Sequence, residues 1–522
     1  MAVVLANSAT VQIDIRAQPY RSSTCSDAAT DALPLTSADA AVQAGVYSSS
    51  AVQTEERGKT YLQAAKGGTD WQHLAAFLNR VVPQLEACLD ENLISTAFAA
   101  RELGDDGAAV PAECAYVLQP LLQPFANSAI QQSPLCCTSV SWNATGNTLA
   151  ASLGRFDIEG WCSQPGALCM WHLNSTDAQP AQPSLRLDTD SCLQCCAFHP
   201  HHPGLIAGGT FNGELLVWDL GREGDALLGK SGLSDASHQE PITQVAWQHS
   251  TQLAARHVGQ TEAYQLVTLG ADGRILIWLW QRPETPVFGY QLVYRRLESH
   301  MATQWGGVSL AFPDQQHQAS SMCVVGTEGG AVLNCVLDYT DAAAKEFAEA
   351  VAAQQALSWP SPVRSDYAAH IGPVHGVHCC AGQPSLFLSS GADGQLRLFS
   401  VLRRKPVAEF APSKMPLFSA QWSPARPLVF AVGAGDGRVY LYDLLQSTMQ
   451  PADIIDVCGK AASVRVLAFN VRQPDLLATS DGAHVKVWRL GSRYSTLHGP
   501  EERLAKQLAD LGEGNIHQLL QS

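Results

Sequence analysis

Short runs of alternating apolar and polar residues, broken by turn residues, dominate the chain from about residue 136 onward. Each unit has an apolar run, a turn, a second apolar run ending in Gly or Ser, an Asp-Gly-like turn, and an alternating run that closes on an aromatic residue. A period of two residues is typical of a strand, and an Asp-Gly pair supplies the positive φ angles of a tight hairpin. The pattern therefore predicts a series of β-hairpins.

The clearest hairpins are residues 270–278, 391–399 and 433–442, in which the aromatic lies five positions beyond the turn glycine. The same spacing joins Gly166 to Trp171 and Gly213 to Trp218, and the last unit has one extra residue. Residues 326–334 keep the turn and the strand but lack the aromatic, which makes seven units. The predicted structural aromatics, which would pack between neighbouring sheets, are Trp171, Trp218, Trp278, Phe399, Tyr442 and Trp488.

Repeats on this scale indicate a ring of small sheets. One four-stranded sheet is marginal alone, whereas a radial arrangement buries the sheet faces and leaves only short edges. Over residues of roughly 136 to 490 the chain resembles the WD-repeat family, although the opening Gly-His is mostly missing and only Trp218-Asp219 is a true Trp-Asp pair. We therefore expect an all-β fold, a seven-bladed WD-repeat β-propeller. Whether the last outer strand comes from before residue 136 or after residue 490 stays open.

The segments outside the repeats have other patterns. Residues 1–68 are rich in Ala, Ser and Thr, contain no Trp or Phe, and show no sustained period, so we expect a disordered arm. Residues 69–110 are expected to form an amphipathic helical segment, 111–492 the propeller, and 493–522 a helical tail with a short helix over 501–520. An Ala-rich helix is expected over 342–357, between the fourth and fifth blades. The helical spacing in the second segment runs through Trp71, Leu74, Leu78, Val81, Leu85 and Leu89.

The charge and composition of the chain disfavour several classes of function. The chain carries 48 Asp and Glu against 33 Lys and Arg, a net charge of −15, which disfavours binding to duplex nucleic acid or to an anionic membrane. No apolar run reaches the roughly 18 residues of a spanning helix, and the N-terminus is a poor secretory signal. The 15 cysteines fit reduced core residues of a soluble cytosolic protein.

The candidates for catalytic or metal chemistry are weak. Cys192, Cys195 and Cys196 precede His199, His201 and His202 in a zinc-like cluster, but strand alternation sends Cys195 and Cys196 to opposite faces. His375, His378, Cys379 and Cys380 are interpreted in the same way. Because no nucleophile elbow, Walker loop or dinucleotide fingerprint is present, we expect neither an enzyme nor a cofactor.

The arm carries two short motifs. Residues 51–54 alternate like a strand that adds to the sheet edge of another protein. They resemble the motif bound by the hub-type dynein light chain, which implies an anchor of Gln53 and Thr54 flanked by Val52 and Glu55. A variant of that motif is similar to Val11, Gln12, Ile13 and Asp14. The alternative for both motifs is a plain linker.

The order of arm motif, helix and propeller resembles that of dynein intermediate chains, most closely the chain of intraflagellar-transport dynein, the second cytoplasmic dynein. Residues 51–55, 74–78, 139–143, 326–330 and 422–430 support the narrower match. The resemblance implies a non-catalytic subunit in the cytoplasm and cilium, at the basal body and on the cytoskeleton.

The partners implied by that resemblance are a dynein heavy chain, a second related intermediate chain, and hub-type and roadblock-type light chains. The roadblock-type light chain would bind the helix that begins at Trp71. The alternative is that this helix is an extra core element of the propeller. The competing class is a WD-repeat substrate receptor of a ubiquitin ligase, or a generic scaffold hub. Such receptors carry the sequence Trp-Asp-x-Arg at the end of a blade. Here Trp218-Asp219 is followed by Leu220 and Gly221, and Arg222 comes one position late, which disfavours the receptor hypothesis.

Overall fold

A computed structural model describes residues 75, 77–83, 112–120, 135–158, 160–173, 182–222, 224–250, 264–294, 303–313, 321–459, 462–497, 499 and 501–510. The chain divides into two units, residues 1–94 and 95–522. The first unit contributes the helical residues 77–83, and the second contains every strand of the described residues. Among the described helices, none is both long and apolar enough to cross a bilayer.

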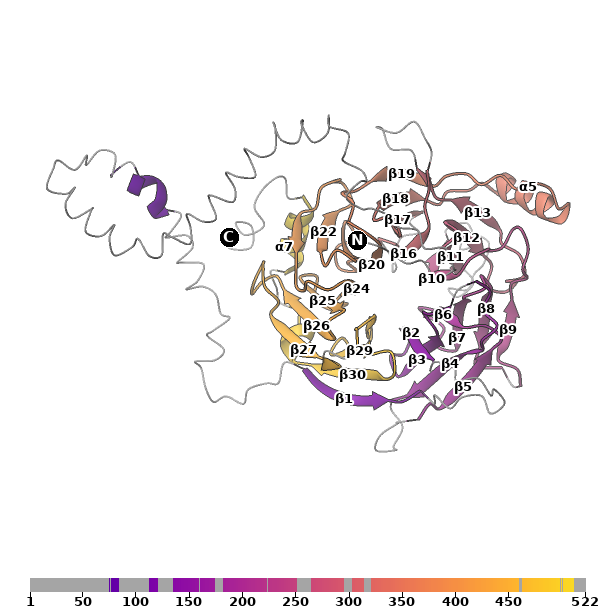
Figure 1. The fold of residues 1–522 in the computed structure, drawn as a ribbon, viewed down its shortest axis with the longest axis horizontal. Helices are drawn as coiled ribbons and strands as arrows, with labels where there is room; N and C mark the ends of the chain where they lie inside the picture. Colours follow the sequence, from indigo (N-terminus) through magenta and orange to yellow (C-terminus); the bar gives the residue numbers. More distant parts are fainter. Residues whose placement is uncertain are drawn as a thin grey trace, which may run out of the picture. The chain divides into compact units, whose positions relative to one another are not determined.

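The second unit is a ring of seven four-stranded antiparallel sheets, which confirms the predicted seven-bladed β-propeller (Figure 1). Blade 1 comprises β2 (Cys136–Trp142), β3 (Thr148–Gly154), β4 (Gly166–His172) and β5 (Leu185–Thr189). Blade 2 comprises β6 (Leu193–Phe198), β7 (Leu205–Thr210), β8 (Leu215–Asp219) and β9 (Leu227–Lys230). Blade 3 comprises β10 (Ile242–His249), β11 (Tyr264–Gly270), β12 (Arg274–Trp278) and β13 (Phe288–Gln291).

The remaining blades follow in chain order. Blade 4 comprises β16 (Gly307–Ala311), β17 (Met322–Thr327), β18 (Val332–Val336) and β19 (Val363–Asp366). Blade 5 comprises β20 (Val374–Cys379), β21 (Leu386–Gly391), β22 (Leu396–Ser400) and β23 (Ala408–Phe410). Blade 6 comprises β24 (Leu417–Trp422), β25 (Val429–Ala434), β26 (Arg438–Asp443) and β27 (Asp453–Asp456), and blade 7 contains β28 (Val466–Phe469), β29 (Leu476–Ser480) and β30 (Val485–Leu490). A two-stranded ribbon, β14 (Val293–Tyr294) with β15 (Thr303–Gln304), follows blade 3.

The ring is closed by a strand from the N-terminal side. The outer strand of blade 7 is β1 (Ala112–Leu118), which pairs antiparallel with β30 from Ala112 opposite Leu490 to Leu118 opposite Val485. Figure 1 shows β1 lying along β30 at the rim of the ring. The outer strand that the sequence left unassigned therefore comes from before residue 136, and both ends of the propeller sequence share one blade.

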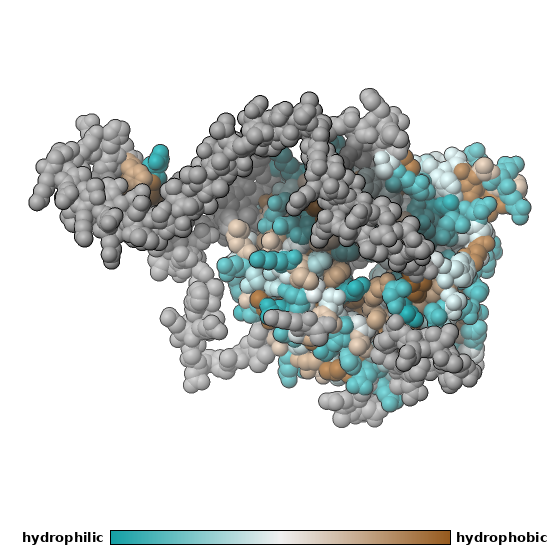
Figure 2. Space-filling view, in the orientation of Figure 1, coloured by the Kyte–Doolittle hydropathy of each residue, from teal (hydrophilic) through white to brown (hydrophobic). Residues whose placement is uncertain are grey.

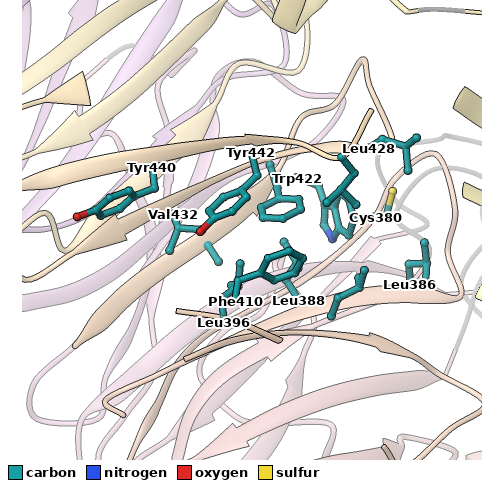
Figure 3. Close-up of a cluster of buried hydrophobic side chains, with 14 of the residues drawn as sticks. Cys380, Leu386, Leu388, Leu396, Phe410, Trp422, Leu428, Val432, Tyr440 and Tyr442 are labelled. Atoms are coloured by element: carbon teal, nitrogen blue, oxygen red, sulfur yellow. The ribbon is translucent and has the colours of Figure 1, made fainter. Parts of the chain in front are cut away.

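The hydrophobic core lies between adjacent blades. Trp422, Phe430 and Tyr442 of blade 6 pack against Phe410 and Leu388 of blade 5 in one cluster. Figure 3 shows Trp422 and Tyr442 of blade 6 pointing toward Phe410 and Leu388 of blade 5. On the face seen in Figure 2, hydrophobic residues of the described part are scattered among hydrophilic ones. The ring is thus held mainly by side chains between neighbouring sheets.

The Asp-Gly turns have the backbone that the sequence predicted. Gly273, Gly394 and Gly437 have φ values of 70°, 72° and 83°. At Gly437 a Cβ atom would also lie 1.9 Å from the carbonyl oxygen of Gly459, so no larger residue fits without movement of the backbone. Gly166 is different: it begins β4, and residues 155–165 connect β3 to β4, so the prediction of a hairpin turn at Gly166 was wrong.

In the described part of the second unit, helices α5, α6 and α7 accompany the blades. Helix α5 (Asp341–Ala352) lies between β18 and β19, so it is an insertion inside blade 4 and not, as expected, a connection between blades 4 and 5. Its Phe347 packs into the core shared by blades 3 and 4. Helix α6 (Ser492–Ser495) follows β30, and helix α7 (Glu501–Asp510) packs through Leu508 against the core of blades 5 and 6.

Candidate functional site

The cysteine and histidine cluster of blade 2 is part of the core. Cys195 packs with Ile242 and Trp247 in one cluster, whereas Cys196 packs with Phe198 in another, so the two thiols project to opposite faces of β6 as predicted. Burial raises the pKa of Cys196 to about 11 and raises that of Cys195 further, so both remain protonated thiols and poor metal ligands. Across the described ranges, no group of His, Cys, Asp and Glu side chains is arranged to hold a metal ion.

A buried polar network in blade 3 was missed by the sequence reasoning. His238 Nδ1 lies 3.1 Å from Asp272 Oδ1, and its Nε2 lies 2.7 Å from Thr268 Oγ1. Trp278 Nε1 donates to the same hydroxyl at 2.9 Å. Burial by itself raises the pKa of Asp272, but the bonds from His238 and from two backbone N–H groups outweigh it and lower that pKa. The network ties the segment before β10 to the Asp-Gly turn and to the aromatic of β12.

Blade 5 repeats this network without the indole. His370 Nδ1 lies 3.0 Å from Asp393 Oδ1, and its Nε2 lies 2.7 Å from Ser389 Oγ, while Phe399 takes the position of Trp278. Burial lowers the pKa of His370, so the ring is neutral, its Nδ1–H donates to the carboxylate, and its Nε2 accepts from the serine. The signal in the sequence was a His before an inner strand and an Asp in the following Asp-Gly turn.

An ion-pair network fixes the C-terminal helix to blade 6. Arg426, in the turn between β24 and β25, is 1% exposed and bonds Asp443 at 2.9 Å and Glu501 at 2.6 Å. It also donates to the main-chain carbonyl of Arg493 in α6. Burial alone lowers the pKa of Arg426, but the two carboxylates outweigh it and raise that pKa, so the guanidinium stays charged. We call Arg426, Asp443 and Glu501 the C-terminal clamp.

The six aromatics predicted from the repeats occupy equivalent places. Each lies in the third strand of its blade, opposite a residue of the second strand, as Phe399 lies opposite Phe387 and Tyr442 opposite Phe430. Five of the six are buried, and Trp488 is half-buried. In blade 4 the position falls to Cys335, which is buried opposite Cys323. A small thiol therefore replaces the aromatic there.

The segments predicted to bind light chains lie mostly outside the described residues. Both arm motifs, Val11 to Asp14 and Val52 to Glu55, are outside, as are Trp71, Leu74, Leu85 and Leu89. Residues 77–83 are helical, with Val81 half-buried. Within this helix Phe77 is 51% exposed, Leu78 44% and Val82 38%.

Comparison with known proteins identifies relatives along most of the chain. The chain is 34% identical over 481 residues to cytoplasmic dynein 2 intermediate chain 2 of Mus musculus, which covers 90% of this chain and 85% of the mouse protein. The Homo sapiens protein of the same name is 34% identical over 446 residues, covering 83% of this chain and 78% of its own. Cytoplasmic dynein 1 intermediate chain of Drosophila melanogaster is 26% identical over 336 residues, covering 63% of this chain and 45% of its own length. No protein-family model matches the chain.

Proposed function

Because the chain belongs to the family of cytoplasmic dynein 2 intermediate chains, we propose that it serves the dynein that carries intraflagellar-transport trains back from the ciliary tip. It acts there as a non-catalytic subunit. The propeller binds the tail of the motor heavy chain, and the N-terminal arm binds light chains that join it to a second, related intermediate chain. Its place of action is the cytoplasm, the ciliary base and the cilium.

The extent of the match is the observation that carries this proposal. Identity to the mouse protein covers 90% of the chain, which is more than the propeller from Ala112 to Leu490 occupies. A relation through the WD-repeat fold alone would align the blades and stop there. The match favours the dynein subunit over a ubiquitin-ligase receptor, with which the chain would share only a propeller.

The exposed helix of the first unit supports binding of a light chain. Phe77, Leu78 and Val82 present large apolar side chains within residues 77–83. Apolar residues on one side of a short helix are the usual means by which a helix docks in the groove of a partner. The helix that includes Leu78 and Val81 is therefore proposed as the site for a roadblock-type light chain.

The arm is proposed to bind the hub-type light chain at Val52 to Glu55, and by a second contact at Val11 to Asp14. A dimeric light chain that holds two chains at two points gains avidity through effective concentration. We expect Gln53→Ala to weaken binding of residues 1–68 to the light chain by about tenfold or more, because Gln53 is the anchor. Calorimetric titration of the wild-type and variant segments measures this, with Gln43→Ala as a control outside the motif. Equal affinities for all three segments would remove Gln53 from the site.

The wider proposal is tested by purification of the tagged full-length chain from ciliated cells. Mass spectrometry is expected to find a dynein heavy chain and both types of light chain in the purified complex. Recovery of a cullin adaptor without any dynein subunit would instead favour the ubiquitin-ligase receptor.

A further inference from the structure

An arginine and several large apolar side chains gather on the face of the ring at which the chain enters the innermost strands. Arg465 directly precedes β28 of blade 7, Phe418 is the second residue of β24 in blade 6, and Phe156 lies two residues after β3 of blade 1. The connection from a second to a third strand opens on the same face as the entry into a first strand. Three adjacent blades therefore contribute to one surface, which we call the entry face.

Arg465 is held by two aromatic rings. Its Cζ lies over the ring of Phe156, 4.2 Å from the centroid, and over the ring of Phe418 at 5.1 Å. Arg465 nevertheless remains exposed to solvent. A guanidinium is planar and has its N–H groups in that plane, so rings packed against it restrict its orientation without using those donors.

The counter-charge of Arg465 is not found in the described part of the chain. Its Nε lies 3.4 Å from Ser463 Oγ, and it forms no ion pair with a described residue. The carboxylate beside Phe156, that of Asp157, already accepts two bonds from Arg155, at 2.9 and 2.8 Å. A guanidinium that is oriented in advance binds a carboxylate at a lower ordering cost, and can do so through two parallel bonds.

Large apolar side chains surround this cation. Phe156 is 46% exposed and Met415 is 48% exposed. Met415 lies beside Phe418, because a Cβ atom at Gly435 would be 3.3 Å from Met415 Cβ and 3.4 Å from Phe418 Cε2. The entry face thus presents a charged group within an exposed apolar surface, which is the usual composition of a site that binds another protein.

The charge on this surface comes from Arg465. His375, whose ring centroid lies 5.0 Å from that of Phe418, is neutral, because burial and the charge of Arg465 lower its pKa. The whole chain carries a net charge of −15, so an extended acidic tract or a nucleic acid would be repelled. The matching partner is a single Glu or Asp side chain flanked by apolar side chains.

We propose that the entry face docks the tail of the dynein heavy chain, with a Glu or Asp of the tail bonded to Arg465 and apolar side chains packed on Phe156 and Met415. The choice of occupant rests on the proposed function, in which the propeller binds that tail. The inference adds the face and the residues that make the contact. An arginine set among aromatic rings commonly supplies a large share of the affinity of an interface.

The test uses the tagged full-length chain with single substitutions. Arg465→Glu reverses the charge, whereas Arg465→Lys keeps the charge but loses the planar group. Arg222→Glu is the matched control: Arg222 is also exposed, but it follows β8, in a connection between third and fourth strands that opens on the opposite face. Each variant is purified from ciliated cells, and the heavy chain and hub light chain recovered with it are quantified by mass spectrometry.

Arg465→Glu is expected to reduce the heavy chain recovered by about tenfold or more, because it places like charges opposite each other, at unchanged recovery of the hub light chain. Arg465→Lys is expected to lose less, and Arg222→Glu to retain both partners. Thermal unfolding of the purified variants, with an unchanged midpoint expected, checks that the propeller remains folded.

Three outcomes of this comparison would overturn the proposal. Wild-type recovery of heavy chain by Arg465→Glu would remove the docking surface and leave the proposed function standing. An equal loss in Arg222→Glu would assign the effect to overall charge and not to the entry face. Absence of a heavy chain from the wild-type preparation would overturn both the proposed function and the docking surface.

A photo-cross-linking phenylalanine analogue in place of Phe156 identifies what lies on the surface. We expect a cross-linked peptide from the tail of the heavy chain that contains Asp or Glu, and weaker cross-linking in the Arg465→Glu background. Reversal of that acidic residue to Lys in the heavy chain is then expected to restore the binding of Arg465→Glu. Cross-links to another protein, within the chain itself, or none at all would contradict the heavy chain as occupant.

Discussion

Single buried charges hold separate parts of this chain together. Arg426 bonds Asp443 at the end of β26 and Glu501 at the start of α7, and all three side chains are almost fully buried. A charge removed from water is tolerated when an opposite charge compensates it, and becomes costly when the partner is lost. The C-terminal helix is therefore held by this guanidinium in addition to the apolar contacts of Leu508.

We expect Arg426→Ala to lower the free energy of unfolding by about 3–5 kcal/mol, because two buried carboxylates lose their counter-charge. Denaturation of the full-length chain by urea measures the change. Arg489→Ala is the matched control: Arg489 pairs with Asp475 at 3.9 Å with both side chains well exposed, so its loss is expected to cost less than about 1 kcal/mol. Similar losses in the two variants would contradict the role given to burial.

The buried His378 makes stability depend on pH. Its pKa of about 4 in the folded chain lies below the value of about 6.5 of an unfolded chain. Between these values the unfolded state binds a proton that the folded state does not, so the free energy of unfolding falls as the pH is lowered from about 6.5 to 4.

We expect His378→Asn to make that fall shallower, because an amide oxygen can accept the Trp422 N–H without titrating. Some dependence on pH will remain, since the pKa of His370 and of His375 is also lowered by burial. Thermal unfolding at pH 7 and pH 5 measures the effect. His484→Asn, at a side chain that is 42% exposed, is the control and should keep the wild-type difference. An unchanged difference in His378→Asn would argue against this titration.

At the scale of elements, local signals were predictable and long-range pairings were not. The hairpins at Gly273, Gly394 and Gly437 followed from the sequence because an Asp-Gly turn and its flanking strands are adjacent. The hairpin turn predicted at Gly166 was wrong because the same spacing from glycine to aromatic lies within β4, which follows a longer connection from β3. β1 could not be assigned, because its register shifts between Cys114 and Tyr116 and its alternation is broken there.

The polar networks escaped prediction for a similar reason. His238 lies 34 residues before Asp272, whereas His370 lies only 23 before Asp393. The spacing varies with the length of the intervening connections, so no fixed motif reveals the pair.

The pairing of β1 with β30 gives a prediction about truncation. Removal of residues 1–111 leaves β1 in place and is expected to keep the midpoint of thermal unfolding of the propeller. Removal of residues 1–118 takes away the outer strand of blade 7 together with the buried Leu118, so a lower midpoint or an added early transition is expected. Calorimetry on both truncated chains makes the comparison. The same unfolding profile for both would show that β1 contributes little to the closed ring.

For the whole molecule, the proposed activities fall in different parts of the sequence. The proposed light-chain sites, at 11–14, 52–55 and along the helix from Trp71, all lie in the unit of residues 1–94. The propeller, proposed to bind the heavy chain, lies in the unit of residues 95–522. Substitutions in one unit are therefore expected to leave the partners of the other in place.

Because β1 and β30 stand at opposite ends of the propeller sequence, the ring cannot be completed while the ribosome is still making it. Residues 119–484 must be synthesised after Leu118 before its partner Val485 exists. At about 5 to 20 residues per second this takes roughly 20 to 70 s, during which β1 has no partner strand. Shielding of the nascent chain by chaperones is the expected remedy, and a premature stop codon anywhere before β30 would yield an open, aggregation-prone arc of blades.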